Sequence, residues 1–199
     1  LLGAARLLSA RREALHGSVL FLFQPAEEIV QGARLALAGG FLDRLPRRPD
    51  CCFALHTRPE LPRGQIAVID GPIMAGKTNF LITLTGRTGH GGSPHKCVDP
   101  VVAGGALIGA LQTVVSRNTD PQDALVCSLC SVRTDAPDYF VPERLTISGS
   151  LRWYREEVHA AALKRVEELA RGVAAAYGCT AAMETEEMAP ATVNHASLF

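Results

Sequence analysis

The sequence predicts an α/β protein in which part of an open, mixed α/β sheet precedes an α+β unit with the order βαββαβ. Two continuous apolar runs, at residues 19–23 and 51–55, are typical of strands covered on both faces. After about Lys77 the pattern alternates between strand and amphipathic-helix periodicity. A chain of 199 residues, 47% hydrophobic and 20% charged, is long enough for one large domain or two small ones.

The first segment predicts helix, strand, helix and strand. Residues 1–8 place their leucines on one helical face, and we interpret them as the middle of a helix whose beginning is not in the sequence. A strand at 19–23 leads to Glu27 and Glu28, and Gly39-Gly40 ends a short helix. A second strand at 51–55 ends at His56. Polar residues after two strands predict a site at one sheet edge.

The second segment predicts a complete small domain. Its expected elements are a strand at 78–86, a helix at 98–117, strands at 124–132 and 143–152, a helix at 155–177 and a strand at 180–185. This order is that of the ferredoxin-like unit, in which two helices cover one face of a four-stranded antiparallel sheet. The predicted domains are residues 1–75 and 76–189, with 190–199 as a return segment.

Charge and composition argue against several classes of partner. Twenty basic and twenty acidic residues cancel, so no nucleic-acid surface is expected. No apolar run approaches the ~20 residues of a membrane span, so no membrane partner is expected. The six cysteines are interpreted as buried free thiols. Free thiols favour a reducing compartment, and we expect a cytoplasmic location.

Glu27, Glu28 and His56 are the first candidates for chemistry. Adjacent carboxylates in extended chain point in different directions, so one can bind a metal while its neighbour faces a bound water. A carboxylate and an imidazole are ligands for zinc or a harder divalent cation. The alternative is a solvated acidic pair opening a helix, with His56 as a buried histidine. The spacing alone favours that alternative.

Five motifs in order along the chain, two of which contain those residues, reverse that preference. They are Gln24-Pro25-Ala26-Glu27-Glu28 with Gly32-Ala33, Ala54-Leu55-His56, the 88–95 segment with Asp99-Pro100, the 141–152 segment, and 190–194. Together they resemble the metal-dependent aminoacylase and carboxypeptidase superfamily, peptidase family M20. The most similar branch holds N-acyl-amino-acid amidohydrolases, hippurate hydrolases and auxin-conjugate hydrolases.

The resemblance implies a metallopeptidase-like amidohydrolase with a catalytic domain and a lid that dimerises. Two divalent metal ions, zinc or manganese, are implied, with Glu28 and His56 as ligands and Glu27 as general base. His90 is implied to reach the scissile carbonyl, often in the site of the partner subunit, and Arg152 to lie near the substrate carboxylate. The implied substrate is a small N-acyl amino acid or a dipeptide-like molecule, and the implied assembly is a homodimer through the lid.

The sequence also departs from the family pattern. Tyr139 stands where an asparagine usually helps to bind the substrate carboxylate, and a phenol lacks the paired donor and acceptor of an amide. The family's remaining ligands, in a Cys-Gly-His-Asp-like segment and a late histidine, are not in this sequence. We therefore expect a fragment that binds metal poorly and hydrolyses nothing by itself. The alternative function is a non-catalytic dimerisation module.

Overall fold

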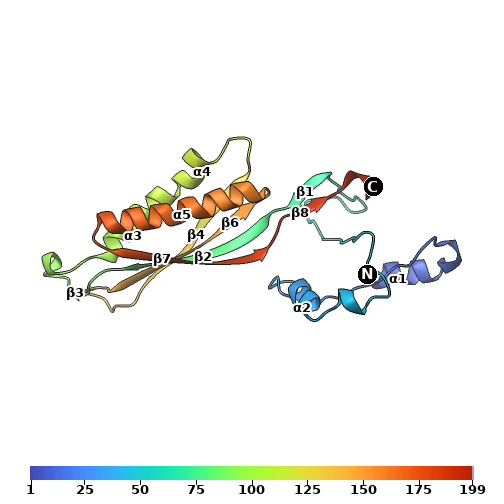
Figure 1. The fold of residues 1–199 in the computed structure, drawn as a ribbon, viewed down its shortest axis with the longest axis horizontal. Helices are drawn as coiled ribbons and strands as arrows, with labels where there is room; N and C mark the ends of the chain where they lie inside the picture. Colours follow the sequence, from blue (N-terminus) through green and yellow to red (C-terminus); the bar gives the residue numbers. More distant parts are fainter. Residues whose placement is uncertain (199) are drawn as a thin grey trace. The chain divides into compact units, whose positions relative to one another are not determined.

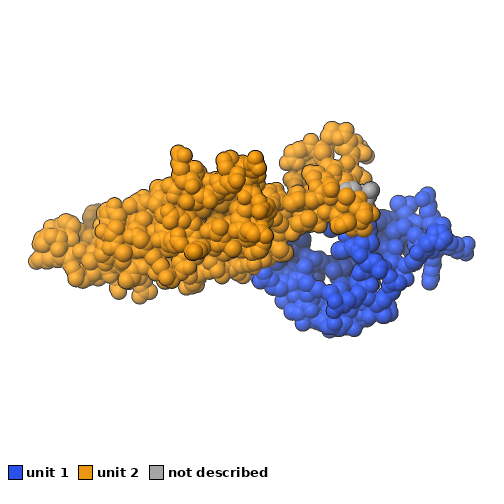
Figure 2. Space-filling model, turned by 45° about the horizontal axis from the view of Figure 1, so that its top comes forward, with its two compact units in different colours: residues 1–54 blue, residues 55–199 orange. Residues whose placement is uncertain are grey.

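The computed structural model describes residues 1–198, and the chain divides into two compact units. Unit 1 comprises residues 1–54 and unit 2 comprises residues 55–199 (Figure 2). The predicted domain boundary at residues 75 and 76 stays a prediction. Mixed α/β structure, as the sequence predicts, is present.

Unit 1 is built from short helical segments. They are α1 (Leu2–Ser9), η1 (Arg12–Ala14), α2 (Gly32–Ala38) and η2 (Leu42–Arg44). The amphipathic start of the chain is helical, as predicted. Gly40 follows α2 with a φ of 71°, a left-handed conformation that glycine adopts without strain and that ends the helix.

The strands predicted at residues 19–23 and 51–55 are absent from the structure. Both segments lie outside every strand and helix assigned among residues 1–198. Phe53 is 70% and Leu55 90% exposed, so these runs are not covered on either face. A strand needs a neighbour that completes its backbone hydrogen bonds, and no described segment supplies one. The prediction from local pattern was wrong because it assumed that neighbour.

We expect unit 1 to exchange its amide hydrogens far faster than the sheet of unit 2. Gly32 is the one buried residue of its two α-helices, so little packing opposes local opening. Hydrogen exchange measured by mass spectrometry on the 199-residue chain should show residues 19–23 fully exchanged within seconds. Protection there equal to that of the central sheet strands would contradict the exposed arrangement.

Unit 2 is organised around a four-stranded antiparallel sheet in the order β4-β6-β2-β7. Its strands are β2 (Gly76–Thr85), β4 (Leu125–Thr134), β6 (Arg144–Trp153) and β7 (Thr180–Ala189). Helices α3 (Pro100–Leu111) and α5 (Glu156–Ala176) cover one face of this sheet (Figure 1). The remaining elements are β1 (Gly71–Met74), β3 (Gly89–His90), η3 (Pro94–Lys96), α4 (Thr113–Asn118), β5 (Phe140–Val141), β8 (Thr192–Asn194) and η4 (Ala196–Leu198).

Two short strand pairs extend this sheet unit. β1 pairs with β8 at the end where β2 begins and β7 ends, and β3 pairs with β5 at the other end (Figure 1). The strands and helices predicted between residues 78 and 185 are observed in the predicted order. Two differences are that the 98–117 helix is two helices that meet at Gln112, and that the short strands β3 and β5 were not predicted.

Strand alternation and helix capping account for this unit. In β2 every second side chain is buried under the helices, including Phe80, Ile82 and Leu84. Helix α3 begins where the carboxylate of Asp99 accepts the Val101 N–H at 2.8 Å, with Pro100 in the first turn. Leu107 of α3 and Val166 of α5 complete a core with no solvent exposure at either residue.

The prediction of six buried thiols was largely wrong. Cys179 is buried and Cys97 and Cys127 are half-buried, while Cys51, Cys52 and Cys130 are exposed. Burial raises the pKa of the Cys127 thiol. Burial and, less strongly, the Asp99 carboxylate raise the pKa of Cys179. These two thiols are therefore less ionised at neutral pH than ordinary cysteines.

Candidate functional site

The acidic pair lies in a strained turn just before α2. Glu27 and Glu28 are exposed and are flanked by Ala26 and Val30, each with a φ of 57°. The turn is closed by the Val30 N–H, which donates to the Glu27 carbonyl at 2.7 Å. A left-handed conformation is rare for a β-branched residue and costs about 1–3 kcal/mol. Such strain gathers at functional sites, which supports a chemical role for this pair.

The close contacts at Gly32 explain why a glycine follows the Gln24–Glu28 motif at this spacing. A Cβ at this position would lie 1.8 Å from the Pro25 carbonyl oxygen and 2.6 Å from the Gln24 side chain. No larger residue fits unless the turn moves. The chain therefore folds back closely on Gln24 and Pro25.

His56 has one ring nitrogen engaged and one available. Its Nδ1 lies 2.7 Å from the Thr57 carbonyl oxygen, which is only an acceptor, so Nδ1 carries the hydrogen in this contact. The neutral ring then keeps its lone pair on Nε2. A neutral imidazole with one nitrogen held by a carbonyl is the usual form of a metal-bound histidine.

The residues of this chain do not by themselves fit a two-metal centre. Carboxylate and imidazole are suitable donors, but across residues 1–198 no group of three or more His, Cys, Asp or Glu is placed to hold a metal ion. Glu27 and Glu28 belong to unit 1 and His56 to unit 2. Their convergence on a common site therefore stays a prediction.

His90 lies at the tip of unit 2, on β3 opposite Phe140 of β5. The Gly92 backbone N–H donates to its Nδ1 at 3.0 Å, so Nδ1 is the unprotonated nitrogen. A neutral ring must then carry its hydrogen on Nε2. The exposed ring contacts Phe140 edge-on, with centroids 6.1 Å apart. The loop therefore fixes His90 as a hydrogen-bond donor through Nε2.

Tyr139, next to this loop, has a left-handed backbone conformation that an aromatic residue rarely adopts. Its φ is 77° and its side chain is 89% exposed, so no packing offsets the left-handed conformation. Its carbonyl accepts the Gly91 N–H at 3.1 Å, which ties it to the His90 loop. Asparagine tolerates this conformation much better than an aromatic residue does.

We expect Tyr139→Asn to stabilise unit 2 by about 0.5–1 kcal/mol, because it relieves part of the cost of the left-handed backbone. Thermal unfolding of the 199-residue chain measures the change. Tyr154→Asn, at a half-exposed position with ordinary φ, is the matched control and should not stabilise. A destabilising Tyr139→Asn would mean that the phenol makes contacts that outweigh the backbone cost.

Arg152 lies near the end of β6 on the face that the helices leave uncovered. Its neighbours across the sheet are Lys77 of β2 and Val126 of β4. The guanidinium is exposed and makes no hydrogen bond or ion pair with the described residues. It is therefore available to an anion, as its predicted role requires.

Comparison with known proteins adds the decisive observation. The sequence profile of peptidase family M20/M25/M40 matches residues 1–199. The chain belongs to this family. It is 37% identical to N-acetylcysteine deacetylase of Bacillus subtilis over 98% of its own length and 50% of that protein. It is 33% identical to the IAA-amino acid hydrolase ILR1-like 4 of Arabidopsis thaliana over 100% of its length and 45% of that protein.

A solved structure is similar over the same span. It is a Bacillus subtilis protein described as a dinuclear metal-binding peptidase from the M20 family, with a TM-score of 0.77 and 32% identity. The match covers 98% of this M20 chain and 48% of that protein. The chain thus spans about half the length of the relatives that it matches.

The sequence analysis missed a buried polar cluster in this M20 chain. The His159 ring stacks on the Trp153 indole with centroids 4.3 Å apart, and its Nε2 lies 2.8 Å from the Thr78 hydroxyl. Its Nδ1 lies 3.0 Å from a Glu156 carboxylate oxygen. Helical periodicity places His159 on the inner face of α5, which was the available signal. The cluster ties the start of α5 to strands β2 and β6.

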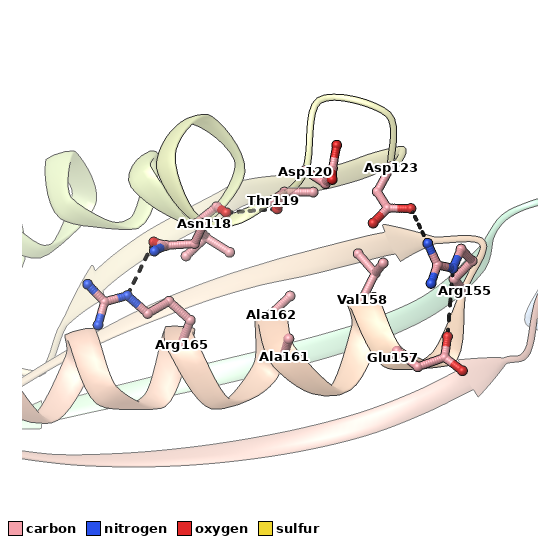
Figure 3. Close-up of a pocket in the computed structure, with 11 residues that line it drawn as sticks. Asn118, Thr119, Asp120, Asp123, Arg155, Glu157, Val158, Ala161, Ala162 and Arg165 are labelled. Carbon is pink, nitrogen blue, oxygen red and sulfur yellow. Dashed lines mark hydrogen bonds and ion pairs between the residues drawn. The ribbon is translucent and has the colours of Figure 1, made fainter.

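A hollow of unit 2 lies elsewhere, between α4, the loop after it, and α5 (Figure 3). It measures about 210 Å³ and is bordered by Arg155, which donates to Asp123 at 2.7 Å, and by Arg165, which donates to Asn118 at 3.2 Å. None of the predicted site residues lines it. These contacts fasten the loop to α5.

No helix among residues 1–198 has the length and apolarity to cross a bilayer.

Proposed function

We propose that the whole protein is a metal-dependent amidohydrolase that cleaves N-acyl amino acids or similar small amides. The observation that carries this proposal is the family match along the entire chain, from residue 1 to residue 199. The relatives named above are a deacetylase of an N-acetyl amino acid and a hydrolase of an indoleacetyl amino acid. Both names describe an amide between an acyl group and an amino acid, which is the bond we propose for this protein.

We also propose that residues 76–189 form a ferredoxin-like lid and residues 1–75 part of a catalytic domain. The sheet order β4-β6-β2-β7 and the two covering helices support the first assignment. The pairing of β1 with β8 brings the two connections of this lid side by side. A cytoplasmic location remains a prediction from the cysteine content.

In this proposal Glu27 moves the proton. Its carboxylate accepts a proton from the attacking water and returns it to the leaving amine, so that the amine departs uncharged. The strained turn holds this carboxylate just ahead of α2, where little else restricts access to it. Glu28 and His56 are proposed as two of the ligands for two divalent metal ions, zinc or manganese. The other ligands are not among the described donors.

His90 is proposed to stabilise, in the site of the partner subunit, the negative charge that develops on the carbonyl oxygen, because β3 lies at the end of the sheet opposite to Arg152. The Gly92 N–H holds Nδ1, so Nε2–H is the group that donates. A fixed donor of this kind acts on the transition state more strongly than on the bound substrate. The proposed substrate contacts are Arg152, for the carboxylate of the amino acid, and Tyr139, which lies beside His90 and so reaches the same site as His90 does.

In the product of the longest open reading frame that encodes this chain, we expect His90→Ala to lower kcat by about 10²-fold, the usual effect of removing one oxyanion donor. His90→Gln should recover part of the rate because its amide keeps an N–H donor. Steady-state kinetics on an N-acetyl amino acid separates kcat from KM. A raised KM with unchanged kcat would assign His90 to substrate binding instead.

The assay that tests the proposed function compares two proteins. One is the 199-residue chain, and the other is the product of the longest open reading frame that encodes it. Each is incubated with zinc or manganese and a panel of N-acetyl amino acids. We expect turnover by the longer product and none above background by the chain. If the longer product with bound metal hydrolyses none of the panel, the proposal fails.

The second candidate, a non-catalytic dimerisation module, is favoured by one feature of the sheet. Edge strand β4 exposes Val126 and Val132, at 51% and 48%, whereas edge strand β7 carries exposed Glu184 and Glu186. Acidic side chains protect an edge from pairing, and apolar ones do not. Pairing through β4 therefore serves a homodimer. Sedimentation of the chain and of Val132→Lys should show a dimer that the substitution dissociates.

A further inference from the structure

The sheet of unit 2 has one face that the helices leave uncovered, here called the open face. On its two central strands it consists of Lys77, Asn79, Leu81, Thr83 and Thr85 of β2 and of Arg144, Thr146, Ser148, Ser150 and Arg152 of β6. None of these residues is buried, whereas the residues that alternate with them on both strands are all buried. The open face is polar, and its charges stand at its two ends.

Lys77 and Arg152 are direct cross-strand partners on this face. In an antiparallel pair the Cβ atoms of such partners lie about 4.5–5.5 Å apart, and like charges placed there repel each other. Neither side chain makes a hydrogen bond or ion pair with the described residues. Two positive charges therefore lie side by side on the open face, and neither is paired with a carboxylate of the described residues.

The surroundings do not neutralise this pair. The second neighbour of Lys77 is Ala189 on β7, and the second neighbour of Arg152 is Val126 on β4. The nearest carboxylates by register are those of Glu187, opposite Thr78, and Glu186, opposite Asn79. Neither forms an ion pair with Lys77 or Arg152. A bound anion would remove the repulsion, and an anion with two charges would balance both cations.

We propose that Lys77 and Arg152 together select a dicarboxylate, the N-acyl derivative of an acidic amino acid. The proposal rests on the proposed function, in which Arg152 receives the carboxylate next to the amide. Lys77 then receives the carboxylate of the amino-acid side chain. Lysine suits this role because its ammonium can donate hydrogen bonds to a carboxylate oxygen in several directions, while the guanidinium fork fixes the first carboxylate.

The test compares N-acetylglutamate with N-acetylglutamine, which has the same shape without the second charge. Binding of each to the 199-residue chain is measured by NMR titration in low salt. We expect N-acetylglutamate to bind about threefold to fivefold more tightly, the range for an exposed ion pair. Lys77→Met should abolish the difference, and Lys77→Arg should keep it. Lys164→Met, the same charge change on α5, should leave the difference intact.

Turnover by the product of the longer reading frame distinguishes the dicarboxylate proposal for Lys77 and Arg152 from the amidohydrolase proposal. Equal affinity for the two ligands, or a preference that survives in Lys77→Met, overturns the assignment of Lys77 even if both ligands are hydrolysed. A preference for N-acetylglutamate that Lys77→Met removes, without hydrolysis of either ligand, supports the pair and overturns the hydrolase proposal. Preference and hydrolysis together support both.

Discussion

Replacing Gly149 by alanine is expected to destabilise unit 2 by about 1–3 kcal/mol, the usual cost of overpacking a core. A Cβ at this position would lie 2.3 Å from Cζ of Phe80 and 2.5 Å from the Ser128 carbonyl oxygen. Phe80 is buried in the core, and the Ser128 backbone belongs to the ladder between β4 and β6. Neither neighbour has room to move, so the sheet itself must distort.

Urea or thermal unfolding of the 199-residue chain measures this loss. Gly172→Ala on α5 is the matched control, because a Cβ there meets nothing within 4 Å. It should stabilise the helix by roughly 0.5–1 kcal/mol, the difference between alanine and glycine in a helix interior. Equal effects of the two substitutions would contradict the close packing around Gly149.

The second large effect is expected at Glu27. In the product of the longer reading frame, Glu27→Gln should lower kcat by about 10²–10⁴-fold, the contribution of a positioned general base. Glutamine keeps the size and shape of the side chain but does not take up a proton at neutral pH. Steady-state hydrolysis of an N-acetyl amino acid measures the loss.

The adjacent carboxylate provides the control. Glu28→Gln should reduce the metal content of the protein, because it removes a ligand, whereas Glu27→Gln should leave the metal content unchanged. Elemental analysis of the purified variants distinguishes the two. Full activity in Glu27→Gln, or loss of metal in that variant instead of in Glu28→Gln, would contradict the assigned roles.

The regular part of unit 2 was predictable because its signals are local. Alternation in β2 and β6 and the helical repeat of α5 arise from geometry within each element, and Asp99-Pro100 and Gly178 mark where helices begin and end. The runs at residues 19–23 and 51–55 were not predictable in the same way. An apolar run becomes a strand only beside another strand, and the local sequence does not say whether that strand is present.

The candidate site shows the same division. The order of its motifs along the chain indicated the family and named Glu27, Glu28, His56, His90 and Arg152 before any coordinates. The sequence by itself thus indicated the residues that we propose for the chemistry and determined which segments become the helices and strands of unit 2.

Only the tertiary structure decided which of these residues become neighbours. Lys77 and Arg152 are 75 positions apart and meet because β2 and β6 pair in one register. Thr78 and His159 meet because α5 lies across that sheet. Such contacts depend on how distant segments pack, and a one-residue change of register would turn each side chain to the opposite face.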